Sequence, residues 1–181
     1  MGSVFNVFKD DARKAFKWDS LGDIKNGRGD LGEEMPVIIY RLMQFTLIDA
    51  LSSELGLTKA NYYFRNAGYL AGSEFAKNVL DLSLDFDGFI SHLQGALKML
   101  KVGILRMEFF NPDDGVVVLT VAEDLDCSGL PITNESVCVY DEGFISGILE
   151  AYTGKKYDVR ETDCWATGDR VCRFKGTPVV N

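Results

Sequence analysis

The sequence predicts an α+β fold in which N-terminal helices pack on an antiparallel sheet, and a C-terminal helix plus hairpin are tied by a metal site. The order of periodic segments is the first reason: helices come first, then two apolar runs, then another helix and two short strands. The second reason is that no crossover helix separates the two apolar runs, so they pair as an antiparallel hairpin. The third is that all four cysteines follow residue 126.

The strongest predicted helix runs from Pro36 to Leu55. Proline in the first turn, preceded by Glu33 and Glu34, favours its start, and Gly56 favours its end. The helix is apolar on most of its circumference, so it is either central to the core or half of a dimer interface. We expect a homodimer formed through this helix.

Three further helices are predicted, over residues 59–80, 87–100 and 141–152. In the first of them, Ala67, Gly68, Ala71 and Gly72 place small residues on adjoining turns and permit the close approach of another backbone. The last is capped by Gly154.

Four strands are predicted. The apolar runs at 102–110 and 116–123 flank a turn by composition, Asn111–Gly115. Two short strands follow the last helix and flank the turn Ala166–Asp169. Both pairs are therefore expected to form hairpins.

The length and composition indicate one globular domain, because 181 residues with 46% hydrophobic and 25% charged side chains need neither disulfides nor metal to form a core. We divide the chain into an N-terminal arm at 1–19, a small-molecule-binding domain at 20–176 and a C-terminal tail at 177–181. The arm carries aromatic residues at Phe5, Phe8, Phe16 and Trp18.

The charge balance excludes some partners. The net charge is −8 and the pI is about 4.7, whereas nucleic acids and anionic membranes attract clustered cations. The first residues lack a signal peptide, and no apolar stretch approaches the length of a membrane span. We therefore expect a cytoplasmic protein with no nucleic-acid or membrane partner.

Two patterns associated with catalysis are weak here. Gly27–Gly32 matches G-x-G-x-x-G, but no buried strand precedes it and Glu33 and Glu34 oppose phosphate binding. His92 is the only histidine, and we expect it to be a partly buried structural residue. No G-x-S-x-G motif is present, so hydrolase chemistry has no support.

The cysteines carry the clearest functional signal, and we expect free thiols. A three-residue loop at 167–169 would put Cys164 opposite Cys172, and Cys138 precedes a helix whose dipole favours its thiolate. Glu161 lies three residues before Cys164, so it joins these thiols only if the strand bends at Thr162–Asp163.

Three thiolates and a carboxylate suit a closed, structural zinc site with no position left for water. Cys127 is an alternative to Glu161 as the fourth ligand. Four unlinked buried cysteines are the simpler alternative.

The C-terminal segment CVYDEGFISGILEAYTGKKYDVRETDCWATGDRVCRF resembles the signature of the 4-vinyl reductase (V4R) domain family. Its Cys, Glu, Cys and Cys are spaced by 23, 3 and 8 residues, as in the zinc-binding ligand-sensing domains of aromatic-responsive transcription activators. The segments GRGDLGEEMPVIIYRL and RNAGYLAGSEFA are also similar to parts of such domains. The resemblance extends over residues 20–175.

The resemblance implies an α+β fold that is usually dimeric and encloses an apolar cavity for a small hydrophobic molecule. It also implies that Cys138, Glu161, Cys164 and Cys172 are the zinc ligands. The chain carries no ATPase or DNA-binding segment. We therefore expect a stand-alone, zinc-stabilised module, without an output domain, that binds or senses a hydrophobic or aromatic ligand in signal transduction.

Two alternatives remain. One is a tetrapyrrole 4-vinyl reductase-type enzyme, although no nucleotide fingerprint or catalytic constellation favours it. The other is an accessory subunit whose helix at 36–55 meets a partner chain.

Overall fold

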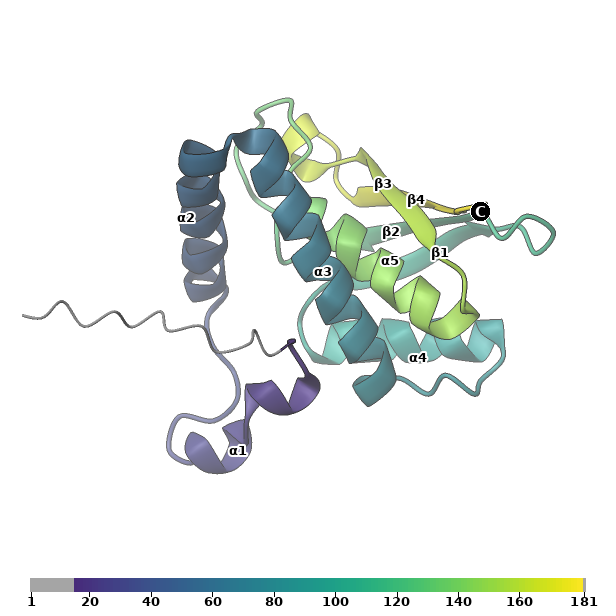
Figure 1. Cartoon of the computed structure of the whole chain (residues 1–181), viewed down its shortest axis with the longest axis horizontal. Coiled ribbons are helices and arrows are strands. Elements are labelled where there is room, and N and C mark those ends of the chain that lie inside the picture. The colour runs from purple at the N-terminus through teal and green to yellow at the C-terminus, as the bar shows by residue number, and fades with distance from the viewer. Residues whose placement is uncertain (1–14, 181) are drawn as a thin grey trace, which may run out of the picture.

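The computed structural model describes residues 15–180 and contains helices on one side of a 4-stranded antiparallel sheet (Figure 1). Phe5 and Phe8, predicted for the N-terminal arm, lie outside the described residues. The elements in order are the 3-10 helix η1 (Trp18–Leu21), α1 (Ile24–Gly27), α2 (Val37–Leu55), α3 (Leu57–Val79), α4 (Phe86–Met99), β1 (Ile104–Phe110), β2 (Val117–Ala122), α5 (Val139–Thr153), β3 (Tyr157–Asp163), the 3-10 helix η2 (Trp165–Thr167) and β4 (Cys172–Pro178).

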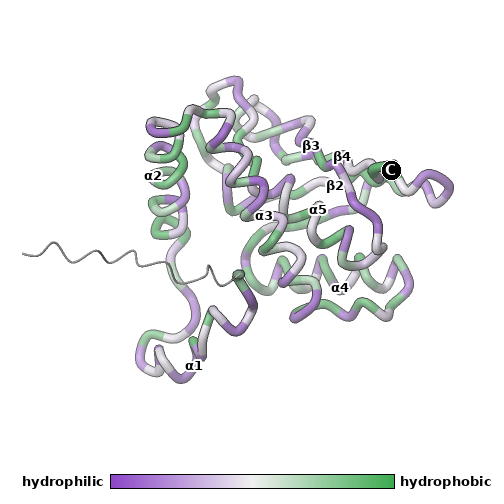
Figure 2. The backbone as a smooth tube through the Cα atoms, in the orientation of Figure 1, coloured by the Kyte–Doolittle hydropathy of each residue, from purple (hydrophilic) through white to green (hydrophobic). Residues whose placement is uncertain are grey.

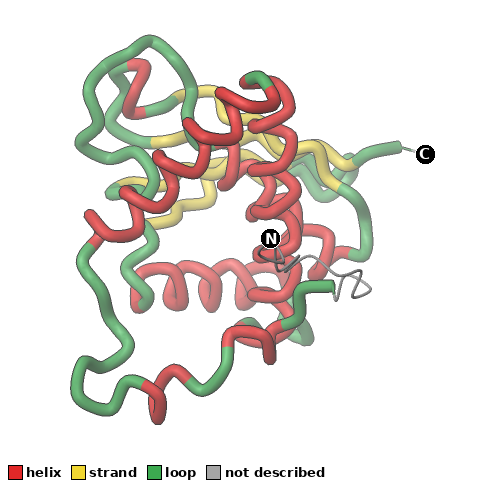
Figure 3. The backbone as a smooth tube through the Cα atoms, turned by 60° about the vertical axis from the view of Figure 1, so that its left-hand side comes forward, coloured by secondary structure: helices red, strands yellow, loops and turns green. Residues whose placement is uncertain are grey.

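The predicted fold class is confirmed. The strand order is β1-β2-β4-β3, and each neighbouring pair is antiparallel. Helices α4 and α5 lie against one face of this sheet, and α3 covers α5 from outside, so the domain has a helical layer and a strand layer (Figures 1 and 3).

The predicted helix boundaries agree with the structure to within two residues. Pro36 is the N-cap of α2, and Gly56, with φ of 81°, ends it. Helix α5 ends at Gly154 in the left-handed conformation. The predicted hairpin of β1 and β2 is also present, with the turn at Asn111–Gly115.

Helices α3 and α5 approach each other very closely, and this contact is the most extensive between any two elements. A Cβ atom at Gly68 or Gly72 of α3 would collide with backbone carbonyl groups of α5. Gly143 and Gly147 of α5 stand in the same relation to carbonyls of α3. The small residues of α3 therefore have the packing role that the sequence predicts, and α5 supplies a matching pair.

The core lies between the sheet and helices α4 and α5. Phe89, Ile148, Leu119 and Phe174, one from each of these helices and from β2 and β4, are all at most 2% exposed. The four cysteines extend this core at one end of the sheet.

Helix α2 stands apart from this core, so a place at the centre of the core, one of its two predicted positions, is wrong. None of its side chains is buried, and hydrophobic residues recur along it (Figures 1 and 2). One face of the helix, which includes Tyr40, Gln44 and Ile48, is half-buried, and the rest of its surface is exposed.

Gly143→Ala tests the close approach of α3 and α5. The added methyl group would meet the carbonyl oxygen of Arg65, so the helices must separate, and we expect a loss of at least about 2 kcal/mol in the free energy of unfolding. Gly95→Ala, in the interior of α4 with no atom near the added methyl, should stabilise by up to about 1 kcal/mol. Urea denaturation compares the two; equal effects would contradict this packing role.

Candidate metal centre and cavity

The four cysteines meet at one end of the sheet. Their sulfur atoms all lie within 4.8 Å of one another, and each residue is at most 1% exposed. The Sγ atom of Cys138 is 3.9 Å from that of Cys164 and 3.7 Å from that of Cys172. Cys127 Sγ lies 3.0 Å from Cys172 Sγ. We call this group the thiol cluster.

Three of the cysteines lie at the start or end of an element, and the fourth lies in a turn. Cys127 lies in the turn after β2, and Cys138 is the N-cap of α5. Cys164 caps η2 directly after β3, and Cys172 is the first residue of β4. The cluster therefore joins the sheet, helix α5 and the turn after β2.

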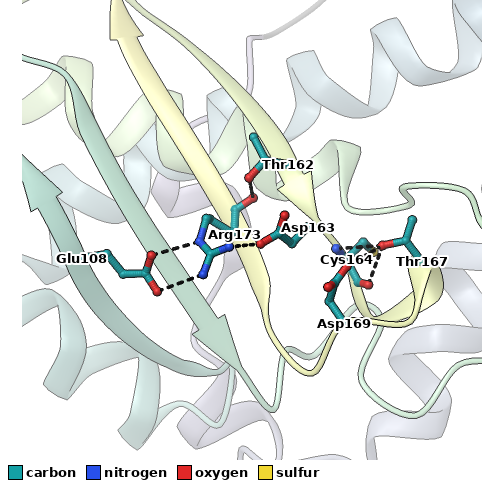
Figure 4. A network of polar contacts seen from close by, with 7 residues as sticks. All are labelled: Glu108, Thr162, Asp163, Cys164, Thr167, Asp169 and Arg173. Carbon is teal, nitrogen blue, oxygen red and sulfur yellow. Dashed lines mark hydrogen bonds and ion pairs between the residues drawn. The ribbon is translucent and has the colours of Figure 1, made fainter.

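The segment that carries Cys164 is held by polar contacts on both sides (Figure 4). Arg173 of β4 donates to Glu108 of β1 at 2.9 Å and also pairs with Asp163. The Thr167 hydroxyl accepts from Cys164 N at 3.1 Å and lies 2.8 Å from Cys164 O. These contacts fix the backbone from which Cys164 projects.

The predicted three-residue loop between Cys164 and Cys172 is wrong. Asp163 is the last residue of β3 paired with β4, opposite Arg173, and η2 occupies the start of a longer connection. The thiols still meet, because η2 turns the chain back immediately after Cys164.

Glu161 reaches the edge of the thiol cluster. The register of β3 and β4 shifts between Glu161 and Asp163. This irregularity is the bend that Glu161 needs in order to lie on the same side of the strand as Cys164. The Glu161 carboxylate accepts from Cys138 N at 3.3 Å, while its Oε1 atom is buried without a hydrogen-bond partner. Burial, together with nearby Cys164, raises the pKa of Glu161 to about 8.

The distances fit a tetrahedral metal ion. With Zn–S bonds of about 2.3 Å, the sulfurs of a tetrahedral site stand about 3.8 Å apart. The separations of 3.9 and 3.7 Å around Cys138 match this value, and the 3.0 Å pair needs only a small outward movement of Cys127. Of the predicted ligands, the structure brings Cys138, Cys164 and Cys172 together, with Cys127 among them and Glu161 beside them.

Three aspartates next to the cluster, Asp124, Asp126 and Asp141, were not predicted from the sequence to belong to the site. Burial and the charge of Asp126 raise the pKa of Asp124 to about 7, and burial raises that of Asp141 well above its usual value. Two sequence signals were available: Asp124 and Asp126 lie three residues and one residue before Cys127, and Asp141 lies in the first turn of α5.

Helix α2 is anchored to the turn that carries Cys127. Tyr40 and Gln44 donate to the two carboxylate oxygens of Asp126, each at 2.7 Å. The Arg41 guanidinium donates to the carbonyls of Leu125 and Ser128, both at 2.9 Å. One face of α2 is thus attached to the domain by polar contacts.

An apolar cavity lies between α4, α5 and the sheet, with a volume of about 30 Å³. Asp124 and Asp141 are its only charged lining residues. The apolar lining includes Leu93 of α4, Val121 of β2 and Ile145 of α5.

The environment of His92 differs from the predicted one. It is exposed rather than partly buried, and its Nδ1 atom accepts from Asp81 N at 3.1 Å. The segment Gly27–Gly32 begins at the last residue of the short helix α1 and is exposed.

Comparisons with known proteins agree with this architecture. The V4R domain model matches residues 117–178. An uncharacterised protein of Methanocaldococcus jannaschii is 30% identical over 154 residues, covering 84% of this chain and 83% of the relative. The phenol-responsive sensory domain of the transcription activator PoxR, crystallised with phenol, has a TM-score of 0.63 at 17% identity, covering 83% of this chain and 78% of that chain.

A vinyl-4-reductase family protein from M. jannaschii has a TM-score of 0.59 at 16% identity, covering 90% of this chain and 94% of that chain. The fold and the site thus define an α+β domain with a cysteine cluster at one end of the sheet and an apolar cavity beside it. The chain belongs to the V4R domain family. Within residues 15–180, no helix has both the length and the apolar character needed to cross a bilayer.

Proposed function

We propose that this chain is a small-molecule-sensing module that binds a hydrophobic or aromatic ligand in the cavity between α4, α5 and the sheet. The observation that carries this proposal is the apolar lining of that cavity in a V4R fold. A structural neighbour, the PoxR sensory domain, binds phenol, a molecule of this class. Apolar cavities with few polar groups are the usual sites for such ligands.

Ligand binding requires the cavity to open. Its volume of about 30 Å³ is far below the roughly 150 Å³ that accommodates benzene in an apolar protein cavity. Helix α5 is fixed by α3, whereas α4 contacts the sheet mainly through β1. We infer that α4 is the wall that moves when a ligand enters.

Toluene and phenol should stabilise the protein against thermal unfolding, by about 2.7 kcal/mol at a hundredfold excess over Kd. Leu93→Ala removes a cavity-lining side chain that is 3% exposed, so it should destabilise the free protein by about 2–5 kcal/mol and enlarge the stabilisation by toluene. Leu70→Ala, on the exposed surface of α3, is the matched control and should respond as the wild type does. A wild-type unfolding temperature unaffected by both compounds would refute ligand binding in this cavity.

The second part of the proposal is a structural zinc ion bound by the thiol cluster. Cys138, Cys164 and Cys172 are three of its ligands, and the distances favour Cys127 over Glu161 as the fourth. Such an ion would join α5 to both C-terminal strands and to the turn after β2. Because thiolates must lose their protons to bind, zinc affinity should fall as the pH falls.

Zinc competition with a chromogenic chelator distinguishes the two candidates for the fourth ligand. Cys127→Ala should weaken zinc binding at least tenfold because a closed site loses one of its four ligands. Glu161→Gln keeps the hydrogen bond to Cys138 N and should change zinc affinity less. The reverse ranking would make Glu161 the ligand, as the family resemblance implies, and no bound zinc in the wild type would refute the site.

The third part is a homodimer formed through α2. Seven of its exposed hydrophobic residues are Val37, Ile38, Ile39, Leu42, Met43, Phe45 and Leu47. Exposed apolar surface of this extent in a helix indicates an interface. Within residues 15–180, α2 carries more exposed large hydrophobic side chains than any other element. The apolar surface best suited to pack against it is therefore α2 of a second copy of the chain, related by a two-fold axis.

Light scattering coupled to size exclusion should give about twice the chain mass of 20.1 kDa. Met43→Glu places a charge on the exposed side of α2 and should yield monomers, because a buried unpaired charge is costly. Met99→Glu, at the exposed end of α4, is the control and should stay dimeric. A wild-type monomer at micromolar concentration would contradict the dimer.

A further inference from the structure

A second group of metal-ligating atoms adjoins the thiol cluster. One carboxylate oxygen of Asp124, one of Asp141 and the Sγ atom of Cys138 all lie within 4.8 Å of one another. Asp124 comes from the turn after β2, Cys138 is the N-cap of α5, and Asp141 lies in the first turn of that helix. The group therefore joins α5 to the end of the sheet on the side that faces the cavity.

The hydrogen bonds of the two carboxylates leave acceptors free in this group. Asp124 uses Oδ1 to accept from Asp126 N at 2.8 Å and from Cys127 N at 3.2 Å. Asp141 Oδ2 is buried and has no hydrogen-bond partner. A buried carboxylate oxygen without a donor or a cation is costly, so this atom points to a missing positive partner.

The neighbouring charges do not supply that partner. In the part of the chain that the structure describes, neither Asp124 nor Asp141 forms an ion pair with a lysine or arginine. Arg41 is the cation attached to this turn, and its guanidinium donates to backbone carbonyls. The groups nearest to the two carboxylates include the carboxyl groups of Asp126 and Glu161, which supply no cation either.

The space available fits an ion. The cavity reaches both carboxylates, and its volume of about 30 Å³ exceeds the roughly 10–15 Å³ that one water needs. It is too small for an aromatic molecule in its present form. A metal ion with one bound water would therefore fit without any opening of the helices.

We propose that Asp124, Asp141 and the Cys138 thiolate bind a second divalent transition-metal ion, for which Zn²⁺ is the best match. Two carboxylate oxygens and one sulfur are all zinc ligands, and three protein ligands leave a fourth position for water. Cys138 would bridge this ion and the one in the thiol cluster. The open position faces the apolar cavity, unlike the closed site formed by four thiolates.

Metal counting tests the second site on the full chain. The protein is incubated with excess ZnCl2, desalted and analysed by inductively coupled plasma emission. We expect about two zinc ions per chain in the wild type and about one in Asp124→Asn and in Asp141→Asn. Asp87→Asn is the matched control, because Asp87 is an exposed carboxylate in the first turn of α4, and it should retain both ions.

A cobalt titration of the wild type gives an answer that needs no variant. Because Cys138 would bind both ions, thiolate-to-cobalt absorption should rise over two equivalents of Co²⁺. Saturation at one equivalent overturns the second site but leaves the thiol-cluster site intact. Two zinc ions in Asp141→Asn would also overturn it, and no bound metal in any sample would refute both sites.

Discussion

The close approach of α3 and α5 is the constraint on which the site depends. Glycines on both helices let each backbone reach the carbonyls of the other, so α5 has little freedom to slide or rotate. One face of α5 is thereby committed to α3, and the opposite face presents Ile145 and Ile148 to the sheet and the cavity. The same placement brings Cys138 and Asp141, in the first turn of α5, to the end of the sheet where Cys172 begins β4.

The turn after β2 connects three features that are distant in the sequence. Asp124 lines the cavity, Cys127 belongs to the thiol cluster, and Asp126 accepts hydrogen bonds from α2. A change in the position of this turn would therefore alter the cavity, the thiol cluster and the contact with α2. This turn therefore connects the cavity to α2, and under the proposed sensing function it is the segment through which ligand binding would reach the exposed surface of that helix.

The sequence predicts the elements well because their signals are local. Proline at 36, glycine at 56 and 154, and the periodic apolar runs define helices and strands without reference to the rest of the chain. The site is harder to predict from the sequence, because the approach of Cys127 to Cys172 depends on how the turn after β2 folds across the sheet. Asp141 illustrates the same limit: its sequence position indicates a helix start, and only the packing reveals a buried oxygen without a donor.

The packing divides the domain into two parts that differ in how extensively their elements contact one another. Helices α3 and α5 with β3 and β4 share the most extensive contacts, and three of the four cysteines lie in or directly beside these elements, so the proposed ion at the thiol cluster would reinforce the more extensively packed part. Helix α4 and β1 share fewer contacts and form the other wall of the cavity. The cavity lies at the boundary of the two parts, where the proposed ligand would separate α4 from α5 and leave the thiol cluster in place. The proposed structural metal and the proposed opening of the cavity are compatible in one small domain, because the thiol cluster lies at the N-terminal end of α5, whereas α4 packs against the sheet mainly through β1.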